Sequence, residues 1–231
     1  MKVFGLQKLT LLDYPGNVAA TVFTAGCNMR CPFCHNAGLV ENINPNEEIG
    51  ENAVFDLLKK RKGILDGICI TGGEPLLHDD LASFIKQVKA LGYKVKLDTN
   101  GSFPNKLELL LNEGLLDYVA VDIKNRKEKY SLTTGLKNFD TKLIDETINI
   151  LKNGNVDYEF RTTVLKNFHT VEDIRAIAQW IEGAKAYYLQ NFVDTGKLLS
   201  KENMEPWDKD TLNNMLEIAK NYISNCELRG I

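Results

Sequence analysis

The sequence of 231 residues is long enough for one domain with a full hydrophobic core, and we predict a single domain over residues 1–231. Hydrophobic residues make up 44% and charged residues 26% of the chain, as in an ordinary globular protein. The formal net charge of −3 predicts no general affinity for nucleic acid or for an anionic membrane surface.

Nothing in the sequence directs the chain to a membrane or out of the cell. No stretch approaches the roughly 20 apolar residues that a membrane-spanning helix needs. The first residues have neither a long apolar run nor a small-residue cleavage site, so a cytoplasmic location is expected. In a reducing compartment, the five cysteines are better explained as ligands or buried thiols than as a disulfide framework.

Short strand-like segments alternate with amphipathic helical segments along the chain, which is typical of a parallel sheet with crossover helices. Strands are predicted at 19–24, 67–71, 93–98, 118–123, 157–164 and 186–192. Helices are predicted at 51–61, 80–91, 105–113, 140–153, 171–182 and 208–223. Six such units indicate an α/β fold, either a partial (βα)6 barrel of the TIM type or an open doubly wound sheet. Both folds bind ligands at the carboxyl ends of their strands.

Glycines support the predicted helix ends independently of the apolar pattern. A residue in the left-handed conformation often follows the last turn of a helix, and glycine adopts it without a steric penalty. Five glycines closely follow predicted helices, namely Gly63, Gly92, Gly114, Gly154 and Gly183.

Three of the five cysteines crowd together directly after the first predicted strand, in the segment Thr24-Ala-Gly-Cys27-Asn-Met-Arg-Cys31-Pro-Phe-Cys34-His35-Asn36. Their spacings of four and three would suit one face of a helix. Pro32 opposes a helix, because it lacks an amide donor and moves Cys31 out of the helical region. We therefore predict a loop that closes around a ligand. Three thiolates on a four-iron cluster leave one iron open to the amino and carboxylate groups of a small molecule.

Three other interpretations of the cysteine motif stay open. Residues 31–35 match the C-x-x-C-H rule for covalent haem, although that attachment requires export. A zinc site with three cysteines and His35 would use the consecutive ligands Cys34 and His35, which is an unusual spacing. A thioredoxin-like Cys-Pro-Phe-Cys pair would leave Cys27 without a role.

The motif resembles that of the radical S-adenosylmethionine superfamily, whose C-x3-C-x2-C loop follows the first barrel strand. The resemblance implies a partial (βα)6 TIM-type barrel, S-adenosylmethionine as cofactor and a 4Fe-4S cluster on Cys27, Cys31 and Cys34. In that family an aromatic residue before the third cysteine lies near the adenine, and Phe33 holds this position here. Packing of Phe33 between the loop and the core is the other interpretation.

The second predicted strand ends in Thr71-Gly72-Gly73-Glu74-Pro75. Two glycines and a proline would serve any tight turn from a strand to a helix. After a cysteine loop, however, the segment resembles the superfamily's GGE motif, which contacts the amino group of the bound methionine moiety. By that resemblance Gly72, Gly73 and Glu74 are cofactor-binding residues.

Charged residues alternate with apolar ones on three later strands. Because side chains alternate across a strand, Asp122 and Lys124 share one face, opposite the apolar residues around them. By the same argument Asp98 and Arg161 lie opposite the apolar residues of their own strands. Buried charges are costly unless they are paired or bind a ligand. These four residues therefore form either an internal ion-pair cluster or a site for a zwitterion that carries a sulfonium, and the cysteines favour the second.

Four other residues invite a functional interpretation that the sequence does not support. Cys69 lies between two isoleucines in a predicted strand and is expected to be a buried apolar residue. Cys226 lies near the carboxyl end without an evident partner. His78 and His169 are predicted in loops or at helix starts, without a catalytic role.

Within the superfamily, nearly the whole chain resembles activating enzymes of glycyl-radical enzymes, in particular the group associated with anaerobic ribonucleoside-triphosphate reductase. The resemblance is carried by Leu12-Asp13-Tyr14-Pro15-Gly16, Gly26 to Asn36, Leu97 to Gly101 and Val121 to Lys124. Related pyruvate formate-lyase activases have a similar turn whose Asp contacts the substrate peptide, and Asp13 matches it. The family's strand carboxylates, here Asp98 and Asp122, can hold a monovalent cation. Its lysine, here Lys124, contacts the cofactor, and Arg161 is a weaker match.

The resemblance also implies the reaction. One electron from reduced flavodoxin or ferredoxin leads to cleavage of S-adenosylmethionine into methionine and a 5'-deoxyadenosyl radical, which abstracts hydrogen from a glycine of the partner. Two alternatives stay open. One is a radical enzyme acting on a small molecule, such as the ring-contracting synthase that converts a deazaguanine precursor. The other is a zinc-stabilised binding domain without enzymatic activity.

Overall fold

The computed structural model describes residues 1–194, 196, 198–200 and 202–230. The chain forms two compact units, one of Met1–Asn28, Gly38–Thr99 and Asn105–Val119, and one of Met29–Ala37, Asn100–Pro104 and Ala120–Ile231. The single domain expected from the sequence therefore stays a prediction. Within the described ranges, no helix combines the length and the apolar character needed to cross a bilayer.

The first unit is built on the strands β1 (Val3–Thr10), β2 (Ala19–Thr24), β3 (Gly67–Gly72) and β4 (Lys94–Thr99). β2, β3 and β4 pair in parallel, with Ala19 opposite Gly67 and Gly67 opposite Lys94. β1 pairs with β2 in the antiparallel direction. β2 and β3 are almost wholly buried, as near-continuous apolar runs in parallel sheets are. The unit's other elements are η1 (Pro45–Glu47), α2 (Gly50–Lys60), η2 (Pro75–Leu77) and α3 (Leu81–Ala90).

Three short elements lie where the chain passes from one unit to the other, so their residues divide between the two. They are α1 (Ala37–Val40), α4 (Pro104–Asn112) and β5 (Tyr118–Asp122). The charged residues predicted at the end of the fourth strand therefore belong to the second unit.

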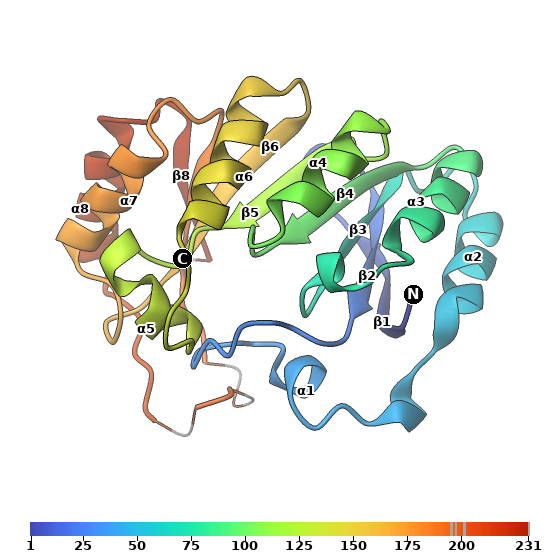
Figure 1. Ribbon diagram of the computed structural model, residues 1–231, viewed down its shortest axis with the longest axis horizontal. Helices are drawn as coiled ribbons and strands as arrows, with labels where there is room; N and C mark the ends of the chain where they lie inside the picture. The colour runs from blue at the N-terminus through green and yellow to red at the C-terminus, as the bar shows by residue number, and fades with distance from the viewer. Residues whose placement is uncertain (195, 197, 201, 231) are drawn as a thin grey trace. The chain divides into compact units, whose positions relative to one another are not determined.

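The second unit contains the parallel strands β6 (Asp157–Val164), β7 (Tyr187–Asn191) and β8 (Cys226–Arg229). α7 and α8 lie side by side, and α8 packs against β8 (Figure 1). The helical elements of this unit are η3 (Lys127–Lys129), α5 (Tyr130–Thr134), α6 (Lys142–Asn153), α7 (Val171–Trp180) and α8 (Lys209–Lys220). The buried residues of α7 include Ile174, Ile177 and Ala178, spaced as one face of a helix requires.

The predicted α/β class is confirmed. The six predicted strands correspond to β2 to β7, and the six predicted helices to α2, α3, α4, α6, α7 and α8, with bounds that differ by a few residues at most. Two strands were not predicted. β1 carries irregularities in its pairing with β2, and β8 has only four residues, so neither has a long regular alternation.

Four of the five predicted glycine caps are confirmed, because Gly63, Gly92, Gly114 and Gly183 all have positive φ. The prediction for Gly154 was wrong. Its φ of −87° and ψ of 176° are extended, because the chain leaves α6 in an extended conformation instead of turning back on the last helical turn.

Candidate functional site

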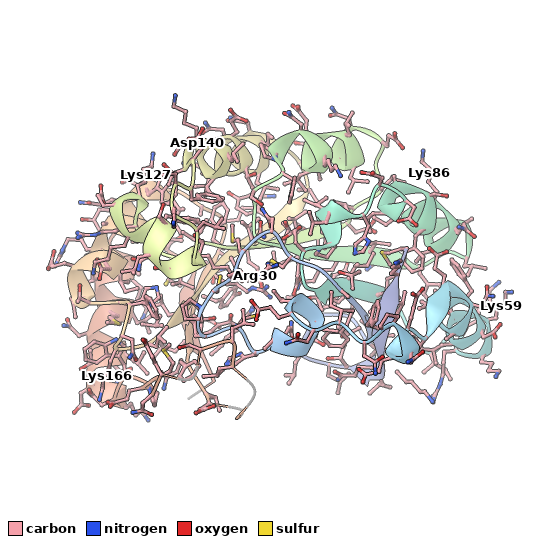
Figure 2. All side chains as sticks on the ribbon, turned by 60° about the horizontal axis from the view of Figure 1, so that its bottom comes forward. Arg30, Lys59, Lys86, Lys127, Asp140 and Lys166 are labelled. Carbon is pink, nitrogen blue, oxygen red and sulfur yellow. The ribbon has the colours of Figure 1, made fainter. Side chains whose placement is uncertain are left out.

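Residues 25–36, which we call the cysteine loop, contain neither helix nor strand, as Pro32 led us to predict. Backbone hydrogen bonds fix its second half within the second unit. Arg30 N donates to Thr134 O at 2.8 Å, and Ser200 N donates to Pro32 O at 2.9 Å. A Cβ on Gly135, which has a φ of +68°, would lie 2.3 Å from Arg30 O. The end of α5 thus packs directly on the loop at Arg30, which Figure 2 labels.

The three loop cysteines differ in exposure. Cys31 is buried, whereas Cys27 and Cys34 are partly exposed. None of the five cysteines, all of which lie in the described ranges, forms a disulfide. Nowhere in the described part of the chain do three or more His, Cys, Asp or Glu side chains gather closely enough to hold a metal ion. Joint ligation by Cys27, Cys31 and Cys34 therefore stays a prediction.

The second half of the cysteine loop lies within electrostatic reach of Lys124, just past the end of β5. Burial raises the pKa of the Cys34 thiol, while a backbone hydrogen bond at Asn36 and the positive charge of Lys124 act in the opposite direction. The Cys31 thiol in turn is one of the groups that raise the pKa of Lys124. The structure therefore brings two of the predicted ligands and the predicted cofactor-binding lysine into one neighbourhood.

Asp122 is held by two cations. Arg161 Nε donates to Asp122 Oδ1 at 2.9 Å, and Lys124 Nζ donates to Oδ2 at 3.1 Å. Burial would raise the pKa of the Asp122 carboxyl, but Arg161 and Lys124 together hold it well below its usual range. Burial would likewise lower the pKa of Lys124, but Asp122 more than offsets this and raises it above the usual range.

These three side chains share a face, as the strand alternation predicted. Asp122 keeps 30% and Lys124 keeps 19% of its side-chain surface exposed, whereas Arg161 is more deeply buried. The ion pairs of the internal-cluster interpretation are present. A ligand could contact Asp122 and Lys124 through the surface that they leave exposed.

Phe33 packs into the interior of the second unit. Its ring lies 5.6 Å from the ring of Phe168 and 6.4 Å from that of His169, between centroids. The side chain is buried, which supports the interpretation that Phe33 anchors the loop to the core. Its position near a bound adenine stays a prediction.

His169 lies after β6 in a loop, as predicted, but its environment was missed. The side chain is fully buried, and Nε2 lies 2.8 Å from Lys124 O. Burial lowers the pKa of His169 to about 4, so the imidazole is neutral at neutral pH. The histidine thus supports the backbone of Lys124. Its position just past the end of a strand was the only signal in the sequence.

The turn Gly72-Gly73-Glu74 packs on the start of the cysteine loop. Gly73 N donates to Thr24 O, and Glu74 N donates to Gly26 O, both at 2.8 Å. A Cβ on Gly73 would lie 1.9 Å from Gly26 O, so only glycine fits. The Glu74 carboxylate is fully buried and accepts hydrogen bonds from Leu76 N and from Thr99 Oγ1. The turn therefore fixes the loop, and its contact with a cofactor stays a prediction.

Asp98, on β4, forms an ion pair with Lys96 two residues earlier. Lys96 is only 1% exposed, and its Nζ lies 3.9 Å from Cys69 Sγ and 5.9 Å from the ring centroid of Tyr118. Cys69 is buried, as predicted. Lys96 was missed, although its spacing of two from Asp98 places both on one face of the strand.

Asp13 lies between β1 and β2, and its carboxylate accepts a hydrogen bond of 2.5 Å from Thr21 Oγ1 on β2. The side chain that forms the local hydrogen bonds of this turn is that of Thr10, not that of Asp13. Thr10 Oγ1 accepts from both Leu12 N and Asp13 N at 3.2 Å. Leu12, beside Asp13, is 88% exposed.

The sequence profile of the radical SAM superfamily matches residues 21–181. A protein of Methanocaldococcus jannaschii, provisionally described as a glycyl-radical enzyme activating enzyme, is 34% identical over 99% of this chain and 96% of its own length. The pyruvate formate-lyase-activating enzyme of Listeria monocytogenes is 33% identical over 58% of each chain.

Solved structures show the same fold at low sequence identity. SuiB of Streptococcus suis bound to its precursor peptide SuiA has a TM-score of 0.71 at 17% identity, covering 91% of this chain and 48% of SuiB. SuiB bound to S-adenosylmethionine has a TM-score of 0.69 at 16% identity. This likeness shows the fold alone, and with it the partial-barrel fold class expected from the sequence is confirmed.

Proposed function

Because the chain belongs to the radical SAM superfamily, we propose that it activates a glycyl-radical enzyme by abstracting hydrogen from a glycine of that partner. The similarity to the Methanocaldococcus jannaschii protein extends over nearly the whole of both chains, which supports this activity over others in the superfamily. The structural observation that carries the proposal is the neighbourhood of Cys31, Cys34 and Lys124.

The family implies a 4Fe-4S cluster and S-adenosylmethionine as cofactors. In the proposal, the thiolates of Cys27, Cys31 and Cys34 would hold the cluster and leave one iron available to the cofactor. The donor set suits this role by its chemistry, because thiolates are the usual ligands of iron–sulfur clusters and these thiols form no disulfide. The chemistry that the bound cluster supplies is one-electron cleavage of the carbon–sulfur bond of S-adenosylmethionine.

The protein's part is to bind and orient the methionine end of the cofactor. Lys124 and Arg161 are placed to attract its carboxylate, and Asp122 to attract its cationic groups. Gly72, Gly73 and Glu74 complete this part of the proposal through their contact with the cysteine loop. Phe33 would lie near the adenine.

The proposal also includes a monovalent cation held by Asp98 and Asp122. The buried ammonium of Lys96 already neutralises Asp98, so the cation would have to share that carboxylate. A potassium titration of S-adenosylmethionine binding would test the need for a cation.

The proposed partner is anaerobic ribonucleoside-triphosphate reductase, and the proposed electron donor is reduced flavodoxin or ferredoxin, in the cytoplasm. Asp13 is the proposed contact to the partner's glycine-bearing peptide. The exposed Leu12 beside it and the hydrogen bond from Thr21 that orients the carboxylate support this role over that of a simple turn residue.

The experiment mixes the reduced enzyme and S-adenosylmethionine with the anaerobic reductase of the same cell and records the glycyl radical by electron paramagnetic resonance. The parent protein should install the radical. Asp13→Ala should cleave the cofactor at the parental rate but leave the reductase without a radical. Asp56→Ala, which removes an exposed carboxylate on α2, is the matched control and should behave like the parent. Cofactor cleavage by the parent without a radical on the reductase would favour another partner or a small-molecule substrate.

A further inference from the structure

We propose that Arg229 is a positioning residue for the cofactor site. By neutralising the buried carboxylate of Glu159, it keeps Arg161 paired with Asp122. The inference rests on the proposed function only in that Asp122 is taken to orient S-adenosylmethionine.

Glu159 is a carboxylate deep inside the second unit, with no exposed surface. Arg229 NH1 donates to Glu159 Oε1 at 2.8 Å, and NH2 donates to Oε2 at 2.9 Å. Such a two-pronged pair is the strongest and most directional arrangement of a guanidinium and a carboxylate. Arg161 NH1 lies 4.0 Å from the same Oε1, too far for a good hydrogen bond.

The three parallel strands explain how Arg229 reaches Glu159. Arg161 on β6 pairs with Tyr188 on β7, and Tyr188 pairs with Glu227 on β8. Side chains two residues apart share a face, so Glu159 and Arg229 lie on that same face. The Arg229 guanidinium crosses the β7 strand over the ring of Tyr188, at 3.3 Å from its centroid.

The charges on this face alternate in sign along a connected series, which is Lys124, Asp122, Arg161, Glu159 and Arg229. A buried carboxylate that loses its partner carries a large desolvation penalty. Arg161 is already 4.0 Å from Glu159 and is a cation that can compensate the lost charge. Its movement toward Glu159 would break the 2.9 Å hydrogen bond to Asp122.

The test measures the affinity of the anaerobically reconstituted protein for S-adenosylmethionine. Arg229→Met should weaken binding by about tenfold, which corresponds to about 1.4 kcal/mol. Glu159→Gln needs no counter-charge and should bind within about threefold of the parent, since Gln keeps the shape of the side chain and its one amide oxygen can still accept from Arg229. The double variant Glu159→Gln with Arg229→Met should recover the affinity that Arg229→Met loses, because no buried charge then attracts Arg161.

Recovery of S-adenosylmethionine affinity in the double variant distinguishes a positioning role of Arg229 from a role in packing alone. If Arg229 only packed against Tyr188, the double variant would stay as weak as Arg229→Met, and the inference would be wrong. Parental affinity in Arg229→Met would also overturn it. If Arg229→Met does not fold, Arg229→Gln replaces it, because glutamine removes the positive charge but keeps a side-chain donor; parental affinity in that variant counts equally against the inference. A parent protein that binds no S-adenosylmethionine would instead refute the proposed function itself.

Discussion

At the scale of single residues, burial decides which protonation state a side chain keeps. His169 has no exposed surface, its Nε2 bonds to the carbonyl of Lys124, and its buried Nδ1 lacks a hydrogen-bond partner. Protonation would place a charge in the interior of the unit, and burial therefore lowers the pKa from 6.5 to about 4. A neutral His169 leaves Asp122 as the dominant partner of Lys124.

The depressed pKa of His169 predicts a loss of stability in mild acid. The unfolded chain binds a proton at His169 below about pH 6.5, whereas the folded chain does not until about pH 4. The free energy of unfolding should therefore fall as the pH falls through this window, by about 3 kcal/mol in total from this residue. Urea unfolding of the metal-free chain at several pH values measures the loss.

His169→Gln is the matched variant, because its amide nitrogen can still donate to Lys124 O but does not titrate. Carboxylates titrate in both proteins, so their contribution cancels in the difference between parent and variant. The variant should lose less stability than the parent between pH 6.5 and pH 4. An equal loss in both proteins would show that His169 is not the responsible group.

At the scale of elements, backbone contacts fix each half of the cysteine loop within its own unit. The turn after β3 contacts the start of the loop, and the short helix α5 contacts its second half. The turn bonds to Thr24, the last residue of β2, and to Gly26 at the start of the loop. α5 bonds to Arg30 through Thr134 and ends in Gly135 against the same residue. The loop geometry therefore depends on backbone contacts, and small side chains at those contacts are required.

Gly135→Ala should impair cluster assembly, whereas Gly114→Ala should not. Both glycines end helices with similar positive φ, +68° and +65°, so each substitution costs roughly 1–2 kcal/mol in backbone strain. Only at Gly135 would the new Cβ collide with the loop, 2.3 Å from Arg30 O, while at Gly114 nothing lies within 4 Å. Thermal unfolding measures the backbone strain, which both variants share. Iron content after anaerobic reconstitution measures the displacement of the loop, which only Gly135→Ala should cause. Equal iron contents in the two variants would contradict a supporting role for α5.

At the scale of the whole molecule, metal content distinguishes the proposed enzyme from a zinc-stabilised binding domain. Anaerobic reconstitution should give about four irons and about four sulfides per chain, as a single four-iron cluster requires. Ala in place of Cys27, Cys31 or Cys34 should abolish the cluster, since two thiolates hold it poorly. Cys69→Ala and Cys226→Ala are the controls and should keep it, because both thiols are buried outside the cysteine loop. Stoichiometric zinc without iron would refute the proposal.

The sequence by itself determined what depends on neighbouring residues. Apolar runs and amphipathic segments predicted β2 to β7 and the helices that follow them, because strand and helix periodicities are local. Pro32 predicted a loop because its effect reaches only the adjacent residue. The shared face of Asp122 and Lys124 followed from the alternation of side chains along a strand.

Only the tertiary structure decided which charges meet. The pairs of Glu159 with Arg229 and of Asp122 with Arg161 join residues 70 and 39 positions apart, and the bond of His169 to Lys124 spans 45 positions. Such contacts depend on which strands become neighbours and in which register. β8 was missed because four residues carry too little periodicity, and with it Arg229 was missed. Burial, which sets the state of His169 and the partner of Glu159, exists only once the whole unit has packed.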